Sequence, residues 1–318
     1  MEIRLIFFIF AALKESTAMK WLTVIILMMC ATVSKAQEIV VDGIRYYGDW
    51  MESATIAAFQ DTGLSGDIVI PAGITSEGRT YAVTKFERFA FSECRHIRSV
   101  VIPSSVNETL YDCGYEFYNC TALEEVILSP NMQMLQGTFM GCTSLQHIVI
   151  PEGVKYMDYV FANCTALRDV SLPEGLVEVG RECFYGCLSL TEITLPASVS
   201  SVGIDAFAFS RGLVSVTCRA AVPPSCLGKF GPRIVAVNPF HDIALQAVLY
   251  VPADAVESYR ITYPWSEFHS ILPISGTSVG KTLRDDKEKA FYAPAGHRIA
   301  GPNGLYIQGG KVKVSRTN

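Results

Sequence analysis

Ten cysteines give this chain its most versatile side-chain chemistry, because a thiolate can attack a substrate, bind zinc or form a disulfide. Five of them occupy one place in a recurring phrase, three residues after a phenylalanine and three residues before a leucine or isoleucine. These five are Cys94, Cys120, Cys142, Cys164 and Cys187. If the copies stack, neighbouring thiols point in parallel, which is a poor geometry for a disulfide. We therefore predict buried thiols that fill the core as small apolar groups.

Four further cysteines have separate settings. Cys183 stands in the small-residue position before Phe184, and Cys218 takes the last buried position of an expected strand. Cys113 and Cys226 lie outside the recurring phrase, so a pairing elsewhere stays open for them. In the recurring slot a serine hydroxyl has no guaranteed partner, so we expect Cys164→Ser to destabilise more than Cys164→Ala.

Other catalytic patterns are weak. Asp61-Thr62-Gly63 matches the triplet of aspartic proteases, but it occurs once and lacks the apolar strand that normally precedes it, whereas that chemistry needs two carboxylates. No metal-ligand spacing relates the five histidines, and no nucleophile-elbow or phosphate-loop motif is present. The histidines are His96, His147, His241, His269 and His297. The sequence predicts a protein that is not an enzyme, without catalytic residues, metal or cofactor.

Composition narrows the class of partner. The chain has 318 residues, of which 50% are hydrophobic and 18% are charged, and its formal net charge is −5. Nucleic-acid binding relies on clustered basic residues that neutralise phosphates. This acidic balance therefore argues against a nucleic-acid partner and leaves enough apolar residues for a large core.

The N-terminus has the layout of a secretory signal. Lys20 precedes an apolar run, and Ser34-Lys35-Ala36 is a small-x-small cleavage site. We predict cleavage before Gln37, with Met19 as a second candidate for the true start of the chain. An uncleaved anchor and a lipoprotein modified at Cys30 are the alternatives. We expect an exported protein with no membrane span in the mature chain, placed at the cell surface, in the periplasm or outside the cell.

Regular repeats organise the middle of the chain and position the cysteines. Successive phenylalanines lie 22, 22, 23 and 23 residues apart. They are Phe117, Phe139, Phe161, Phe184 and Phe207. A period of this size falls within the range of leucine-rich repeats and indicates a solenoid. An earlier, less regular copy begins at Phe91, and we interpret the surplus residues between Val106 and Phe117 as a loop that bulges from one turn.

Each repeat also contains a short strand. The alternation of apolar and other residues gives it one buried and one open face, and stacked copies form a parallel sheet with about 4.8 Å between strands. A proline follows most of these strands and helps to end the ladder at a fixed register. Apolar residues further on, such as Leu176, Val179, Val199 and Val202, then fill the opposite wall of the coil.

Two columns of side chains are expected on the open face of this sheet, and we treat them as the candidate binding face. The first column reads Val101, Ile127, Val149, Ser171, Thr194 and Thr217. The second column reads Ser99, Glu125, His147, Asp169, Glu192 and Ser215. Concave faces of solenoids often bind partners. The plain alternative is that β-branched residues simply suit strands.

The phrase from Gly180 through Cys183, Phe184, Cys187 and Leu190 to Pro196 resembles the BspA-type leucine-rich repeat, a bacterial class common on the surfaces of gut and oral Bacteroidetes. The resemblance extends over roughly residues 38–275. It implies a solenoid that is mostly β, with short irregular or helical turns, a right-handed coil, a parallel sheet and β-rich caps. It also implies an adhesin or binding module for matrix proteins, bacterial partners or glycans.

The expected organisation has six parts: 1–36 signal peptide, 37–67 N-terminal cap hairpin, 68–218 repeats, 219–275 C-terminal cap, 276–290 linker and 291–318 short β-rich C-terminal module. The sequence favours a binding or adhesion module that recognises a protein or glycan, such as host extracellular matrix, through the repeat face. A structural or glycan-capture component of the cell envelope is the alternative function.

Overall fold

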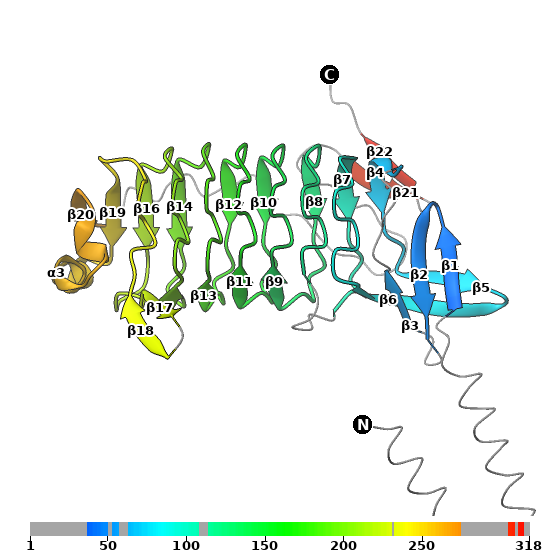
Figure 1. The fold of residues 1–318 in the computed structure, drawn as a ribbon, viewed down its shortest axis with the longest axis horizontal. Helices are drawn as coiled ribbons and strands as arrows, with labels where there is room; N and C mark the ends of the chain where they lie inside the picture. Colours follow the sequence, from blue (N-terminus) through cyan, green and yellow to red (C-terminus); the bar gives the residue numbers. More distant parts are fainter. Residues whose placement is uncertain are drawn as a thin grey trace, which may run out of the picture.

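A computed structural model describes residues 37–49, 53–56, 63–107, 114–230, 232–274, 305–308 and 311–314. The predicted signal peptide, Asp61 to Thr62, Cys113 and the predicted linker lie outside these residues. Within the described part, no helix is both long and apolar enough to cross a membrane. Figure 1 shows an elongated stack in which successive turns of the chain follow one another along the long axis.

One face of the stack is a succession of short parallel strands. Hydrogen bonds join them in three groups, ordered β4-β7-β8, β10-β12 and β14-β16-β19-β20. The first two groups comprise β4 (Ser65–Val69), β7 (His96–Val101), β8 (Glu125–Ile127), β10 (His147–Val149) and β12 (Asp169–Ser171). The third comprises β14 (Glu192–Leu195), β16 (Ser215–Cys218), β19 (Val248–Val251) and β20 (Ser270–Pro273). The predicted parallel sheet is confirmed.

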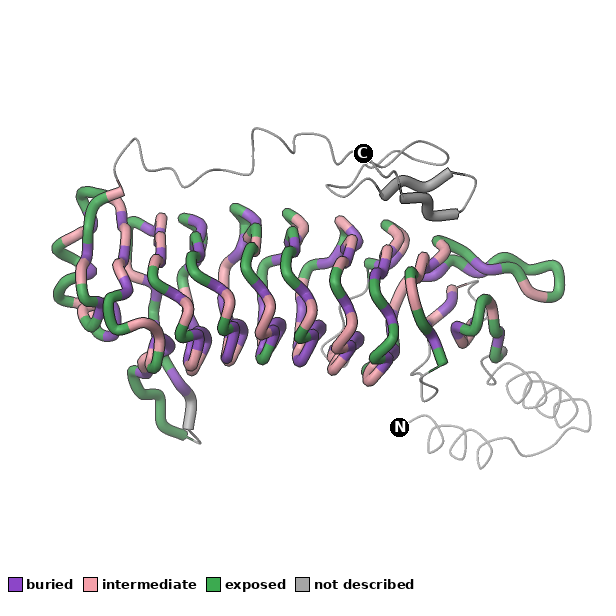
Figure 2. Tube along the Cα trace, turned by 90° about the horizontal axis from the view of Figure 1, so that it is seen from above, coloured by how far each residue is buried: buried purple, intermediate pink, exposed green. Residues whose placement is uncertain are grey.

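The opposite wall carries a second parallel ladder. Its strands are β9 (Met134–Gln136), β11 (Tyr156–Asp158), β13 (Glu178–Val179) and β15 (Ser201–Val202). Leu176 and Val179, predicted for this wall, are fully buried, as is Val202. Figure 2 shows buried positions returning at the same places in turn after turn. This regularity explains why one period in the sequence predicts both walls.

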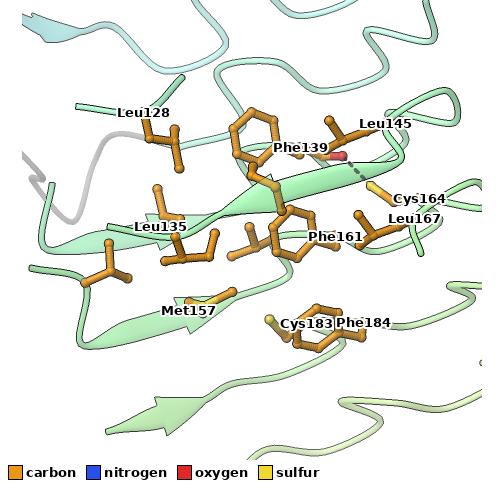
Figure 3. Packing of buried hydrophobic residues seen from close by; sticks show 14 of the residues in the cluster. Leu128, Leu135, Phe139, Leu145, Met157, Phe161, Cys164, Leu167, Cys183 and Phe184 are labelled. Atoms are coloured by element: carbon orange, nitrogen blue, oxygen red, sulfur yellow. Dashed lines mark hydrogen bonds between the residues drawn. The ribbon is translucent and has the colours of Figure 1, made fainter. Parts of the chain in front are cut away.

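A row of stacked phenylalanines forms the spine of the core. Rings from consecutive turns lie 5.2 to 5.8 Å apart between centroids, with interplanar angles of at most 26°. The row consists of Phe91, Phe117, Phe139, Phe161, Phe184, Phe207 and Phe240. Figure 3 shows part of it, with Leu145 and Leu167 packed beside the rings. Offset stacking adds to the free energy of burial, so the spine stabilises contacts between turns more than contacts within one.

The recurring cysteines lie beside this spine, buried as predicted, and all eight described cysteines are reduced thiols. Cys142 donates its S–H to the carbonyl of Phe117 at 3.1 Å, and Cys164 donates to that of Phe139 at 3.0 Å (Figure 3). Cys120 and Cys187 make the same bond to Phe91 and Phe161. Each thiol therefore bonds to a residue of the preceding turn.

A serine already occupies the last slot of this column. The Ser210 hydroxyl donates to the Phe184 carbonyl at 2.6 Å and accepts from the Cys187 amide at 3.0 Å. A serine in this slot thus has a partner available, which the sequence could not guarantee for Cys164→Ser. The carbonyl that accepts the bond belongs to the backbone of the neighbouring turn, which no side-chain pattern reveals.

Two caps close the ends of the core. At the N-terminal end, a five-stranded sheet has the order β1-β2-β3-β6-β5. Its strands are β1 (Gln37–Val41), β2 (Ile44–Gly48), β3 (Ser53–Ile56), β5 (Gly73–Ser76) and β6 (Arg79–Phe86). Strands β5 and β6 form a hairpin with Glu77 in its turn, where the φ of Glu77 is 50°. The cap sheet thus includes residues beyond 67, while β4 already belongs to the repeat face.

At the C-terminal end, aromatic side chains cover the last turn. The hairpin of β17 (Leu227–Phe230) and β18 (Arg233–Ala236) projects from the stack in Figure 1. Beyond it come the short helices η1 (Ala253–Ala255), α3 (Val256–Ile261) and η2 (Trp265–Glu267). The Trp265 indole is buried and donates to the Pro224 carbonyl at 2.9 Å. Strands β21 (Leu305–Gln308) and β22 (Lys311–Val314) pair as an antiparallel hairpin in the predicted C-terminal module.

One carboxyl group is buried in the core of an N-terminal repeat. Glu116 directly precedes Phe117, where other turns have Ala90, Thr138 or Val160, and its Oε2 has no hydrogen-bond partner. Burial raises the pKa of Glu116 to about 7, although hydrogen bonds partly oppose this change. A carboxyl whose pKa is higher in the folded state favours folding at low pH.

We expect Glu116→Gln to remove part of the pH dependence of stability. In the wild type, the contribution of Glu116 falls as pH rises from its unfolded pKa of about 4.5 to its folded pKa of about 7. The amide cannot ionise, so the variant should be the more stable form at pH 8 by about 1–3 kcal/mol. Urea unfolding at pH 5 and pH 8 measures the difference, and exposed Glu124→Gln is the matched control. Equal pH dependence in wild type and variant would contradict this assignment.

We also expect the order of the cysteine variants to be the reverse of the order expected from sequence. Cys164→Ser keeps a donor for the Phe139 carbonyl and should cost about 1 kcal/mol or less. Cys164→Ala loses this bond and leaves a small void, so it should cost about 1–2 kcal/mol. Chemical denaturation of both variants tests the order, with Ser210→Ala as a second removal of the same bond. A serine variant less stable than the alanine variant would refute it.

Candidate functional site

The two predicted columns lie in register on the repeat face. Val101 pairs with Ile127, and Val149 pairs with Ser171. In the second column Ser99 pairs with Glu125, and His147 with Asp169. Further along, Glu192 and Thr194 lie opposite Ser215 and Thr217. Parallel pairing therefore places the members of each column side by side within each of the three strand groups, although these residues come from separate repeats.

Exposure differs along the face. Among the apolar side chains of the two columns, that of Val149 is the most accessible, with an exposed fraction of 64%. The exposed predicted residues besides Val149 are His147, Asp169, Ser171, Glu192 and Thr194. The half-buried ones are Val101, Glu125 and Ile127. Ser99 is buried, because its hydroxyl donates to Asp67 of the neighbouring strand at 2.8 Å. The centre of the face is thus the part most available to a partner.

The N-terminal end of the face is already engaged in polar contacts. The Arg98 guanidinium donates to both carboxylate oxygens of Asp67, at 3.2 and 2.7 Å. Burial acts to raise the pKa of Asp67, but hydrogen bonds from Arg98 and Ser99 outweigh it and lower that pKa. Glu125 lies near this pair, and burial followed by the Asp67 charge raises its pKa. These groups form an internal network.

The central strands carry a polar pair beside Val149. The Nδ1 of His147 lies 2.5 Å from Oδ2 of Asp169, and both side chains are about half exposed. The pair crosses from β10 to β12 and leaves Val149 and Ser171 beside it on the same face. This arrangement places one open apolar group among exposed polar groups, which is the composition of many protein interfaces.

The face is longer than the sequence predicted. Register adds Asp67 and Val69 at its beginning, because they pair with Ser99 and Val101. It adds Val248 and Tyr250 at its end, because they pair with Ser215 and Thr217. The signal for the second pair was present, since Leu249-Tyr250-Val251 repeats the alternation of the strands. Because the sequence places this segment in the expected C-terminal cap, it does not predict that β19 continues the parallel ladder.

The described residues offer little to catalysis. None of them forms a group of three or more His, Cys, Asp or Glu side chains that could hold a metal ion. Burial raises the pKa of Cys142, Cys183 and Cys187 well above the usual value, which keeps these thiols protonated. The closest polar constellation is His241 between Asp205 and Asp242, at 2.9 and 3.2 Å.

Comparison with known families explains the repeat. The model for the BspA type leucine rich repeat region matches residues 57–159 and 136–223 in six copies, which together cover more than half of the chain. The chain belongs to this family. Its members repeat a short strand and a turn, as β10 to β12 do here. The leucine-rich-repeat fold expected from the sequence is therefore established.

The solved structures that match this chain include several leucine-rich-repeat proteins. One is a leucine-rich repeat protein of T. pallidum, with 26% identity and a TM-score of 0.49 over 57% of this chain and 81% of that one. Another is a leucine rich cell surface protein of Faecalibacterium prausnitzii, with 21% identity and a TM-score of 0.45 over 74% of this chain and 72% of that one. A leucine-rich repeat protein of Bacteroides ovatus has 20% identity and a TM-score of 0.43 over 74% of this chain and 76% of that one. No curated protein matches this BspA-type chain.

Proposed function

We propose that this BspA-type protein is an exported, non-catalytic binding module whose repeat face recognises a protein partner. The observation that carries the proposal is the exposed Val149 at the centre of the face, on the strand that follows the half-buried pair of Val101 and Ile127. A protein interface combines an apolar centre with a polar rim. Here His147, Asp169 and Glu192 supply that rim.

The rigidity of the face supports this assignment. Each strand is anchored by buried residues of both neighbouring turns, so the outward side chains are held in place before a partner arrives. The acidic members of the second column favour a partner surface with basic groups. A column that is apolar over its first three strands and a column with acidic members therefore favour a partner that is partly apolar and partly basic, and a protein of the extracellular matrix is our first choice.

We expect lysines at the centre of the face to weaken binding without affecting the fold. The double variant Val149→Lys/Thr194→Lys changes two exposed positions on separate strands and removes the apolar centre. Because interface energy is concentrated in central residues, the affinity should fall more than about tenfold. Solid-phase binding and calorimetry against a panel of purified matrix proteins measure the effect, and circular dichroism checks folding.

The matched control places lysines on the opposite wall. Gln133→Lys/Ser200→Lys changes two exposed residues just before β9 and β15, and it should leave affinity unchanged. The exposed Arg181 is not used as a control, because its guanidinium makes contacts within the fold. It lies 5.4 Å from the centroid of the Tyr159 ring and 3.9 Å from the Asp158 carboxylate. Equal affinity in both double variants would refute the repeat face as the binding site.

A further inference from the structure

A second surface lies along the turns that precede the phenylalanine spine. Two residues before each spine phenylalanine from Phe91 to Phe207, the backbone has a positive φ. The residues in this slot are Phe89, Tyr115, Gly137, Tyr159, Glu182 and Asp205, with φ between 46° and 62°. Such a conformation suits glycine, asparagine and aspartate, and it disfavours bulky residues. Three aromatic residues therefore occupy positions for which the backbone selects other types.

These aromatic side chains do not belong to the core. Phe89 is 38% exposed, and Tyr115 and Tyr159 are half-buried. Phe89 and Tyr115 stack at 5.3 Å between centroids, and Tyr118 packs edge-on against both. We call Phe89, Tyr115, Tyr118 and Tyr159 the aromatic row. Strained backbone that is retained outside the core is a known mark of functional surfaces.

Glycine makes room for the Tyr115 ring in the intervening turn. A Cβ on Gly137 would lie 2.4 Å from the Cε1 atom of Tyr115, so the tyrosine ring covers the slot of the next repeat. Tyr159 follows in the turn after that. The slots of Tyr115 and Tyr159 are thus two turns apart, about 10 Å at the spacing of stacked strands. That is the length scale of a disaccharide.

An arginine lies at each end of the row. The Arg88 guanidinium is 5.1 Å from the Phe89 centroid and 5.3 Å from the Tyr115 centroid, and it has no carboxylate partner among the described residues. At the other end Arg181 lies over Tyr159 at 5.4 Å. The Arg88 guanidinium, held against the aromatic rings, keeps its N–H donors available for a carboxylate or sulfate. The Arg181 guanidinium also lies 3.9 Å from the Asp158 carboxylate, which shares its charge.

We infer that the aromatic row with Arg88 and Arg181 is a binding site for an acidic saccharide. A pyranose ring presents C–H groups that pack against aromatic rings and hydroxyls that bond to polar groups around them. The tyrosines offer both an apolar ring and a hydroxyl, and the two arginines match acidic groups on the sugar. A protein partner fits less well, because four partly buried aromatic side chains and two arginines present less surface than the about 800 Å² per partner of a typical interface.

This inference is independent of the proposed repeat-face function, because the row belongs to the turns and shares no residue with the two columns. Calorimetry on the full chain would use three probes of equal length: a neutral maltohexaose, a hexagalacturonate and a heparin hexasaccharide. We expect binding of at least one acidic probe, with affinity that falls as salt rises, and at least tenfold weaker binding of the neutral probe. The two acidic probes distinguish carboxylate from sulfate as the recognised group.

Two variants separate binding from folding. Tyr115→Asn/Tyr159→Asn removes two rings but suits the positive φ, so the affinity for the acidic probe should fall more than tenfold while Tm stays unchanged or rises. Arg88→Gln/Arg181→Gln should lower the affinity similarly and remove the salt dependence. Tyr156→Thr, an exposed tyrosine of β11 outside the row, is the matched control and should bind as the wild type does.

Three results would overturn the assignment. The first is an absence of binding to every probe at millimolar concentration. The second is equal binding of neutral and acidic probes. The third is unchanged affinity in the arginine variant, which decides the question even if the tyrosine variant folds poorly, because both guanidinium groups are exposed. A tyrosine variant with lower Tm and wild-type affinity would show that the row only stabilises the turns.

Discussion

The structure depends on one constraint, which is that no single turn of this chain can bury its own hydrophobic core. The ring of each core phenylalanine stacks on rings of the adjacent turns, and its carbonyl accepts a hydrogen bond from a thiol or hydroxyl of the following turn. Its amide donates in turn to the next repeat, as that of Phe139 does to Val160. Stability is therefore a property of neighbouring pairs of turns, and the two ends need caps of different construction.

That constraint also accounts for what the sequence could predict. A fixed period repeats every contact, so the spacing of Phe117, Phe139 and Phe161 was sufficient to predict the solenoid, the buried cysteine column and the parallel sheet. Two details were out of reach. The partner of Cys164 is a backbone carbonyl, and the left-handed slots of Tyr115 and Tyr159 are filled against local preference. Both come from three-dimensional packing, which residue types alone do not encode.

The same reasoning applies to the candidate surfaces. The columns on the repeat face followed from alternation in the strands, and strand pairing places their members opposite one another within each strand group. It was incomplete at the ends, where Asp67 and Tyr250 extend the face from segments that resembled caps. The structure adds that accessibility is unequal, since Ser99 is covered by its own neighbours while Val149 is open. The repeat face and the aromatic row use different parts of the same turn, so one coil presents two chemically distinct surfaces.

The uniform register of the stack has an evolutionary consequence. Because each turn offers its successor the same set of carbonyls, rings and strand partners, a whole unit such as residues 139–160 can be duplicated or lost by recombination, and its former neighbours then meet in an equivalent arrangement. The length of both surfaces can therefore change in steps of one repeat without redesign of the caps. The length of ligand that the surfaces can contact then depends on the number of repeats. Point substitutions change the side chains of each repeat independently of that number.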